Sequence, residues 1–222
     1  MKKQIDQQLA KIIDHTLLRA DATFDELKKL CEEVVTYGFA SVCVGSGNVA
    51  EVSRLLGDAK VVIAAVVGFP LGNVAPQAKA FEAAEAIRMG AKEIDMVINL
   101  GALKSKNYRA VFEEIDLVVR AALPYPVKVI IEASLLTRDQ KVAACVLAQA
   151  AQAAFIKTST GFDRQGGAIV EDLKLIREIV GDRMKIKASG GISSREVAKR
   201  MIQAGADRIG SSSGIVLVTE DG

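Results

Sequence analysis

Phe155-Ile156-Lys157-Thr158-Ser159-Thr160-Gly161-Phe162 is the stretch from which the fold can be worked out. A short apolar run ends in a lysine and then leads through small polar residues to a glycine, which is typical of a buried strand followed by a loop. The same arrangement returns at Lys185-Ile186-Lys187-Ala188-Ser189-Gly190-Gly191-Ile192. These two stretches predict two strands, each with a lysine close to its end.

Similar short runs rich in β-branched residues continue in both directions along the chain, separated by segments with helical periodicity. Alternation of this kind is expected of βα units around a parallel sheet. The sequence predicts eight strands, at residues 12–16, 40–44, 61–67, 93–99, 127–132, 154–158, 184–188 and 208–211.

Helices are expected between these strands, since capping boxes and a proline mark their starts and glycines mark their ends. Capping boxes at Thr23, Thr137 and Ser193 mark three helix starts, and one helix is expected over residues 76–89. Helix ends are expected before Gly38, Pro124, Gly181 and Gly205. The whole pattern predicts one α/β domain over residues 1–222, a (β/α)8 barrel with a short N-terminal helix. Because the chain ends soon after the eighth strand, the last helix must be short, and an open doubly wound sheet is the alternative.

Composition limits the classes of partner. The chain has 222 residues, half of them apolar, and 29 Lys and Arg against 27 Asp and Glu give a net charge of +2. Without a polybasic run, a nucleic-acid partner is not expected. The longest apolar stretch, 61–69, is too short to cross a bilayer, and the charged first residues lack the apolar segment of a secretion signal. We therefore expect a cytoplasmic protein that binds neither membranes nor nucleic acids.

The residues that commonly bind cofactors are sparse. Cys31, Cys43 and Cys145 are widely spaced without a Cys-x-x-Cys pair, so neither disulfides nor a metal site is expected. His15, the one histidine, is expected to be a hydrogen-bonded structural residue rather than a catalytic base. Residues 45–50 have the spacing of a dinucleotide fingerprint, but the next strand ends without the acidic residue that would hold a ribose. No nicotinamide cofactor is expected.

Lys157 and Lys187 are the first candidates for chemistry, because residues at the C-terminal ends of barrel strands point into the mouth of the barrel. If their strands are neighbours, the backbones lie about 4.8 Å apart and each ammonium disfavours the charge of the other. An unprotonated lysine can form a Schiff base with a carbonyl compound. A single strand lysine more often points outward or pairs with a carboxylate. Two lysines at matching strand ends favour imine chemistry.

Asp95 is the third candidate. Period-two alternation places Asp95, Val97 and Asn99 on one face of a strand, and this mixed face is expected to be the barrel interior. A carboxylate there could transfer protons or hold an ammonium ion, or it could be paired for purely structural reasons. The residues alone leave these alternatives open.

Two glycine-rich loops predict a phosphate site. Gly190-Gly191 and Gly210-Ser211-Ser212-Ser213-Gly214 follow the last two expected strands, and both would present backbone N–H groups near helix starts, where anions bind. Barrels frequently hold a phosphate with the loops after strands seven and eight. Turn formation alone would also explain these residues.

Seven motifs follow one another in order along nearly the whole chain, at residues 13–18, 68–72, 93–99, 127–132, 156–162, 187–192 and 208–213. Together they resemble the deoxyribose-phosphate aldolase family of class I aldolases. The resemblance implies reversible cleavage of the sugar phosphate 2-deoxy-D-ribose 5-phosphate to acetaldehyde and D-glyceraldehyde 3-phosphate, with no metal or organic cofactor.

The resemblance also implies roles for particular residues. Lys157 would form the Schiff base, Lys187 would tune it, and Asp95 would transfer protons together with Lys187 and water. By the same resemblance, the phosphate is surrounded by Gly161, Gly190, Gly191, Gly210, Ser212 and Ser213, and the pocket is lined by Asp14 and Thr160.

Two features depart from the family pattern. Residues 45–48 follow Cys43-Val44 where the family often has Asn-Pro, and the chain ends without the longer tail of some relatives. Substrate fit and the preference for phosphorylated over free aldehydes are therefore left open. Cys43, at the expected strand end, is either a target for unsaturated aldehydes or, as is commoner, a buried small residue.

Three further points are open at the level of the sequence. A different Schiff-base barrel aldolase would keep Lys157 but act on a longer sugar phosphate, and a non-catalytic sugar-phosphate-binding barrel would form no covalent adduct. A homo-oligomer, either a dimer or a tetramer, is expected because barrels often associate through apolar helix faces.

Overall fold

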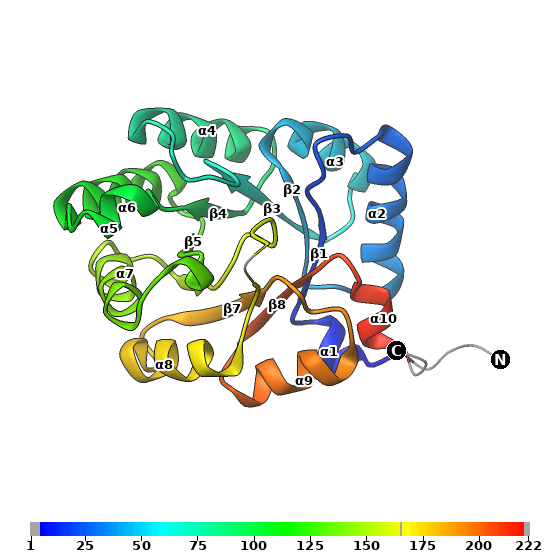
Figure 1. Cartoon of the computed structure of the whole chain (residues 1–222). Coiled ribbons are helices and arrows are strands. Elements are labelled where there is room, and N and C mark those ends of the chain that lie inside the picture. The colour runs from blue at the N-terminus through cyan, green and yellow to red at the C-terminus, as the bar shows by residue number, and fades with distance from the viewer. Residues whose placement is uncertain (1–4, 165, 220–222) are drawn as a thin grey trace.

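A computed structural model describes residues 5–164 and 166–219 of the chain. Eight parallel strands close into a barrel in chain order, and the last strand pairs with the first (Figure 1). The expected (β/α)8 fold is thereby confirmed, and the open sheet is excluded. The strands are β1 Ile13–Leu17, β2 Ser41–Gly45, β3 Val62–Val67, β4 Glu93–Val97, β5 Val127–Ile130, β6 Phe155–Lys157, β7 Lys185–Ser189 and β8 Arg208–Ser211.

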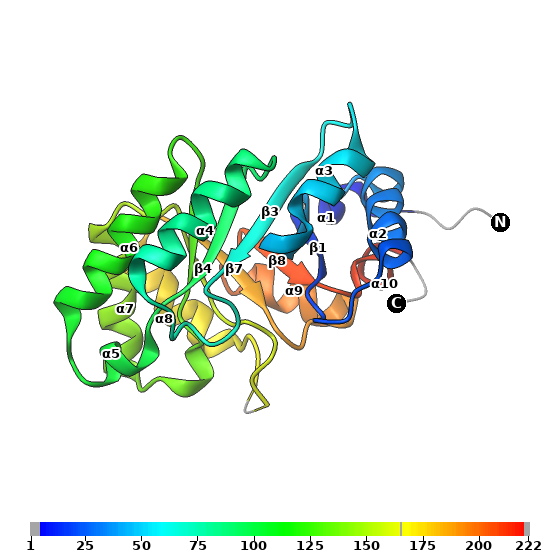
Figure 2. The same cartoon turned by 90° about the horizontal axis from the view of Figure 1, so that it is seen from above.

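The helices lie outside the strands, as Figures 1 and 2 show from two directions. A short N-terminal helix is present, as predicted. The helices are α1 Gln7–Ala10, α2 Phe24–Tyr37, α3 Val49–Leu56, α4 Pro76–Arg88, α5 Leu100–Lys104, α6 Tyr108–Ala122, α7 Arg138–Ala150, α8 Val170–Val180, α9 Arg195–Gln203 and α10 Gly214–Val218, with 3₁₀ turns η1 Ser46–Asn48 and η2 Ala133–Leu135.

Local capping chemistry explains where several helices begin and end. Thr23 and Thr137 form the expected capping boxes of α2 and α7, and Gly38 ends α2 in the left-handed conformation at φ 70°. Glycine adopts this conformation without a steric penalty. The third expected box was wrong by one residue: Ser194, not Ser193, caps α9 by accepting a hydrogen bond from the Val197 N–H.

Two strands end two residues earlier than expected. The strand predicted to reach Asn99 ends at Val97, because the Asn99 side chain caps α5 instead. The strand predicted to reach Glu132 ends at Ile130, and Glu132 itself has a left-handed backbone at φ 43°. Both differences lie at the C-terminal ends of strands, where the chain turns away from the barrel.

Side chains of the strands divide between two environments. Ile94, Met96 and Ile98 belong to the large apolar core that the strands share with the helices. Asp95 points the other way, into the barrel, as the alternation predicts. A small apolar cluster of Cys43, Ala64 and Val66 also lies apart from the main core, and Leu18 and Phe69 pack against it.

The two ends of the described chain meet beside the barrel. The Asp6 N–H donates to the Val218 carbonyl over 2.9 Å, and Ile5 forms an antiparallel bridge with Thr219, so α1 lies next to α10 (Figure 1). No helix among the described residues is both long and apolar enough to cross a membrane.

Candidate active site

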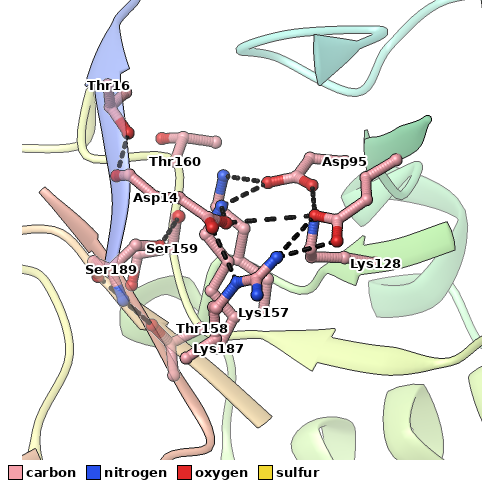
Figure 3. Close-up of polar contacts among 12 residues, drawn as sticks. Asp14, Thr16, Asp95, Lys128, Lys157, Thr158, Ser159, Thr160, Lys187 and Ser189 are labelled. Atoms are coloured by element: carbon pink, nitrogen blue, oxygen red, sulfur yellow. Dashed lines mark hydrogen bonds and ion pairs between the residues drawn. The ribbon is translucent and has the colours of Figure 1, made fainter. Parts of the chain in front are cut away.

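Closure of the barrel brings together basic and acidic side chains that are far apart in the sequence. Lys157 on β6 is the direct partner of Lys187 on β7, so the two lysines are neighbours as predicted. Asp95 on β4 is the partner of Lys128 on β5. Figure 3 shows these four side chains pointing toward one another inside the barrel.

Asp95 is the shared acceptor of this cluster. Its Oδ2 accepts hydrogen bonds from Lys157 Nζ over 2.9 Å and from Lys187 Nζ over 2.8 Å, while Oδ1 accepts from Lys128 Nζ over 2.7 Å. Asp95, Lys128 and Lys187 are completely buried. One carboxylate therefore holds three lysines in fixed positions (Figure 3).

A second layer of charges supports the first. Asp14 on β1 lies 2.5 Å from Lys187 Nζ and accepts a hydrogen bond from Arg208 Nε over 2.6 Å. Arg208 also binds both oxygens of Glu93, over 2.7 and 2.9 Å, and Glu93 lies 2.5 Å from Lys128 Nζ. We call Asp14, Glu93, Asp95, Lys128, Lys157, Lys187 and Arg208 the barrel network.

The network stabilises fixed charges on most of its members. Burial alone would raise the pKa of Asp95, but Lys128, Lys157 and Lys187 together hold that pKa well below its ordinary value. Lys187 responds in the opposite sense: burial would lower its pKa, and the attraction of Asp14 and Asp95 raises it. Both groups are therefore ionised at neutral pH.

Lys157 differs from the other lysines of the barrel network. Burial lowers its pKa, and the charge of Lys187 lowers it further, against the attraction of Asp95. The network contains four basic groups and three acidic groups, so it is electrically neutral when one basic group loses its proton. Lys157 is also the only lysine of the network that borders the cavity at the barrel mouth. It is the member most readily deprotonated.

The cavity at the mouth has a volume of about 780 Å³. Most of the residues expected around a phosphorylated substrate border it, and so does Lys157. They are Thr160, Gly161, Gly190, Gly191, Gly210, Ser212 and Ser213. Asp14, which was expected to line the pocket, does not border the cavity: it is completely buried below, where Lys187 and Arg208 hold it.

Lys128, Arg208, Glu93 and Glu132 were not singled out from the sequence. Lys128 interrupts an apolar strand, and the alternation that identified Asp95 would have placed Lys128 inside the barrel too. Glu132 accepts hydrogen bonds from both the backbone N–H and the hydroxyl of Thr160. No local pattern indicates that contact.

Two other candidates have structural surroundings. The His15 ring is buried with Nε2 2.7 Å from Glu33 Oε2, in agreement with a hydrogen-bonded structural role. Cys43 lies in the middle of β2 and not at its end as expected, and it is completely buried. Burial raises the pKa of the Cys43 thiol, which favours the buried small residue over the reactive thiol.

Comparison with known proteins provides independent evidence. A family model described as DeoC/LacD family aldolase matches residues 8–217. The deoxyribose-phosphate aldolase of Caldicellulosiruptor saccharolyticus is 52% identical over 97% of this chain and 99% of that protein. The deoxyribose-phosphate aldolase of Methanothermobacter thermautotrophicus is 49% identical over 98% of this chain and 97% of that protein.

A solved structure agrees with these sequence relatives. The deoxyribose phosphate aldolase of Aeropyrum pernix, described as tetrameric, matches with a TM-score of 0.89 and 33% identity over 95% of this chain and 89% of that one. Since the family model covers most of the chain and relatives near half identity span it almost end to end, the chain belongs to the DeoC/LacD aldolase family.

Proposed function

We propose that the protein is a class I aldolase that reversibly cleaves 2-deoxy-D-ribose 5-phosphate to acetaldehyde and D-glyceraldehyde 3-phosphate. The observation that supports this most directly is Lys157, a buried lysine of lowered pKa that borders a cavity next to a network of fixed charges. The names of the relatives identify the substrate class.

The reaction begins when the neutral Lys157 amine adds to the aldehyde carbon of the open-chain sugar and water is lost. The resulting iminium accepts the electron pair of the C2–C3 bond as the C3 hydroxyl gives up its proton. D-Glyceraldehyde 3-phosphate leaves, and an enamine of acetaldehyde remains on Lys157. Protonation of the enamine at C2 and hydrolysis of the imine release acetaldehyde and return the amine.

The barrel network supplies what these steps require. Asp95 lies within 2.9 Å of Lys157 Nζ and Lys187 within 2.8 Å of Asp95, so this pair can pass protons to and from the amine through water. The residues proposed to surround the phosphate, Gly161, Gly190, Gly191, Gly210, Ser212 and Ser213, border the same cavity. Neutral hydroxyls and backbone N–H groups suit the binding of a phosphate.

We also propose that the protein is cytoplasmic. Cys31, Cys43 and Cys145 are free and buried, which suits a reducing compartment such as the cytoplasm. A homo-oligomer is also proposed, with the tetrameric relative from Aeropyrum pernix as support. Exposed apolar side chains such as Leu71 and Phe81 are candidates for the contact between subunits.

Reductive trapping tests the proposed function. The protein is incubated with acetaldehyde or deoxyribose 5-phosphate, treated with borohydride and analysed by peptide mapping. We expect one added mass, on Lys157, that disappears in Lys157→Met. It should persist in Lys185→Met, the control, because Lys185 is the exposed first residue of β7. Labelling scattered over surface lysines, or no labelling, would instead indicate a non-catalytic sugar-phosphate-binding barrel.

Trapping alone does not distinguish deoxyribose 5-phosphate from a longer sugar phosphate. A panel of sugar phosphates with increasing chain length separates the two kinds of Schiff-base aldolase. We expect the highest kcat/KM with deoxyribose 5-phosphate.

A further inference from the structure

Glu132 is a buried acidic residue that none of the steps above uses. It lies two residues after the end of β5, is 3% exposed and has a backbone φ of 43°. Among the described residues, three that are not glycine have positive φ, and Glu132 is the only buried one. Sparsely populated backbone conformations of this kind gather at functional sites, where the surrounding structure holds them in place.

The hydrogen bonds that the Glu132 carboxylate accepts from described residues all come from Thr160. Thr160 donates its hydroxyl to Glu132 Oε2 over 2.5 Å and its backbone N–H to both carboxylate oxygens over 3.2 Å. No lysine or arginine among the described residues forms an ion pair with Glu132 at 4.0 Å or less. The carboxylate is therefore held by the two donors of Thr160.

This arrangement decides which way the Thr160 hydroxyl is oriented. Its proton points to Glu132, and its oxygen already accepts one hydrogen bond, from the Phe162 N–H over 3.1 Å. A hydroxyl oxygen has two acceptor sites. One acceptor site of the Thr160 hydroxyl is therefore left. Thr160 borders the cavity together with Lys157, which is three residues earlier and ends β6.

We propose that Glu132 is the positioning residue that makes Thr160 the acceptor of the C3 hydroxyl proton in carbon–carbon cleavage. This rests on the proposed aldolase function and adds the group that receives the proton from the substrate. In the cleavage direction the C3 hydroxyl proton moves to Thr160 Oγ1 while the Thr160 proton moves to Glu132 Oε2. The electron pair of the C2–C3 bond passes to the iminium, so no other oxidant, reductant or base is needed.

The same groups run the synthesis direction in reverse. Protonated Glu132 returns a proton through Thr160 to the new C3 alkoxide as the enamine attacks the aldehyde. Thr160 ends each turnover with the same number of protons as at the start. Glu132 must lose or regain one proton between turnovers, and the cavity gives Thr160 access to solvent for this exchange.

The charges around Glu132 agree with this role. Burial raises the pKa of Glu132, and the nearby charge of Asp163 adds to this, while Thr160 and Lys157 act against it. A carboxylate with a raised pKa has a stronger affinity for a proton than Asp95, whose pKa is held well below its ordinary value. Between the two, Glu132 is the better proton acceptor.

The experiment separates carbon–carbon cleavage from imine chemistry. Exchange of the methyl protons of acetaldehyde in D₂O requires the Lys157 imine and enamine but involves no C3 hydroxyl. For Glu132→Gln we expect kcat for cleavage to fall by about 100-fold or more, the scale of general acid–base catalysis. We expect acetaldehyde exchange and borohydride trapping to stay within about twofold of the wild type.

Thr160 variants repeat the test independently of Glu132. Thr160→Val should lose cleavage and keep exchange, and Thr160→Ser, which restores the hydroxyl, should recover cleavage relative to Thr160→Val. Thr160→Val combined with Glu132→Gln should be no slower than the slower of the two single variants. If Glu132→Gln does not fold, Thr160→Val and Thr160→Ser still decide whether Thr160 accepts the C3 hydroxyl proton, and loss of cleavage with exchange kept in Thr160→Val remains the expected result.

Glu114→Gln is the matched control, because Glu114 is also a buried carboxylate whose pKa burial raises but lies on α6 outside the cavity. It should keep the wild-type ratio of cleavage to exchange. The wild-type cleavage rate should also fall as the pH drops through the raised pKa of Glu132, and this limb should be absent in Glu132→Gln.

Two outcomes would overturn the inference: wild-type cleavage by Glu132→Gln, or a parallel loss of cleavage and exchange, which indicates a purely structural role. A wild-type protein that neither exchanges nor traps acetaldehyde would instead contradict the proposed aldolase function.

Discussion

Lys157 and Lys187 are the same residue type on adjacent strands, yet their pKa values move in opposite directions. The difference comes from Asp14, which contacts Lys187 and not Lys157. Two carboxylates keep Lys187 charged, and the charge of Lys187 then helps to lower the pKa of Lys157. A second acidic partner for Lys187 is thus sufficient to move the pKa values of the two lysines apart.

Removal of Lys187 should reverse this division. In Lys187→Met the remaining basic and acidic groups of the barrel network are equal in number, so the network is neutral only with Lys157 protonated. The pKa of Lys157 should rise, and the pH at which trapping by acetaldehyde begins should increase by roughly 1–3 pH units. The measurement is the rate of borohydride-trapped adduct formation between pH 5 and 10. Lys185→Met is the control, and an unchanged or lower onset would contradict the charge argument.

At the scale of elements, α4 and α6 are joined to the end of β4 by a buried ion pair. Lys79 on α4 donates to Glu114 on α6 over 2.8 Å and to the Val97 carbonyl of β4 over 2.8 Å. Glu114 also accepts from the Asn99 N–H over 3.0 Å. Burial lowers the pKa of Lys79 and raises that of Glu114, and the attraction between the two charges opposes both shifts.

Breaking this pair should cost more than replacing it. Lys79→Met should lower the free energy of unfolding by about 3–5 kcal/mol, because Glu114 stays buried without its cation. The double variant Lys79→Met, Glu114→Leu should be less destabilised than the single one. Urea unfolding of both variants decides this, and a double variant at least as unstable as Lys79→Met would count against it.

Removal of a helix cap should lower the free energy of unfolding by less than the loss of Lys79 and should leave the active site unchanged. Thr137→Ala removes the hydroxyl that accepts from the Gln140 N–H at the start of α7 and should cost about 1 kcal/mol. Thr137→Ser keeps the hydroxyl and should retain most of the stability. Cleavage at 25 °C should be unchanged in both, since Thr137 does not border the cavity. Equal stability of the alanine variant and the wild type would argue against the cap.

For the whole molecule, the barrel network links stability to pH. Asp14 and Asp95 have pKa values in the folded state below their ordinary value of 3.8. Their stabilising contribution is therefore fully present above that value and is lost as the pH falls below it toward the folded-state pKa values. The pKa values of Glu114 and Glu132 are raised in the folded state. Ionisation of these two groups therefore lowers the free energy of unfolding as the pH rises above the ordinary pKa of glutamate.

Urea unfolding between pH 7 and pH 2 checks this dependence. We expect the free energy of unfolding to drop steeply below about pH 4 as the unfolded carboxylates take up protons. Asp95→Asn should be much less stable at pH 7 and should show a shallower decline below pH 4. A stability that stayed constant down to pH 2 would mean that the network contributes nothing to the fold.

The sequence by itself determined the features that depend on neighbours along the chain. Strand β8, the capping boxes at Thr23 and Thr137 and the left-handed stop at Gly38 were predicted from local patterns, because side-chain alternation and capping involve residues a few positions apart. Two matching strand ends likewise indicated that Lys157 and Lys187 would be neighbours. The local pattern failed where two neighbouring residues, Ser193 and Ser194, could each cap the same helix.

Only the tertiary structure decided which charges meet. Closure of the barrel pairs β8 with β1 and thereby brings Arg208 to Asp14, far away along the chain. Glu132 reaches Thr160 for the same reason, since β5 and β6 lie side by side. No periodicity encodes such contacts, because burial and the distance between charges depend on the register of the closed sheet. Those two quantities set the pKa of Lys157, so its chemistry is a property of the fold.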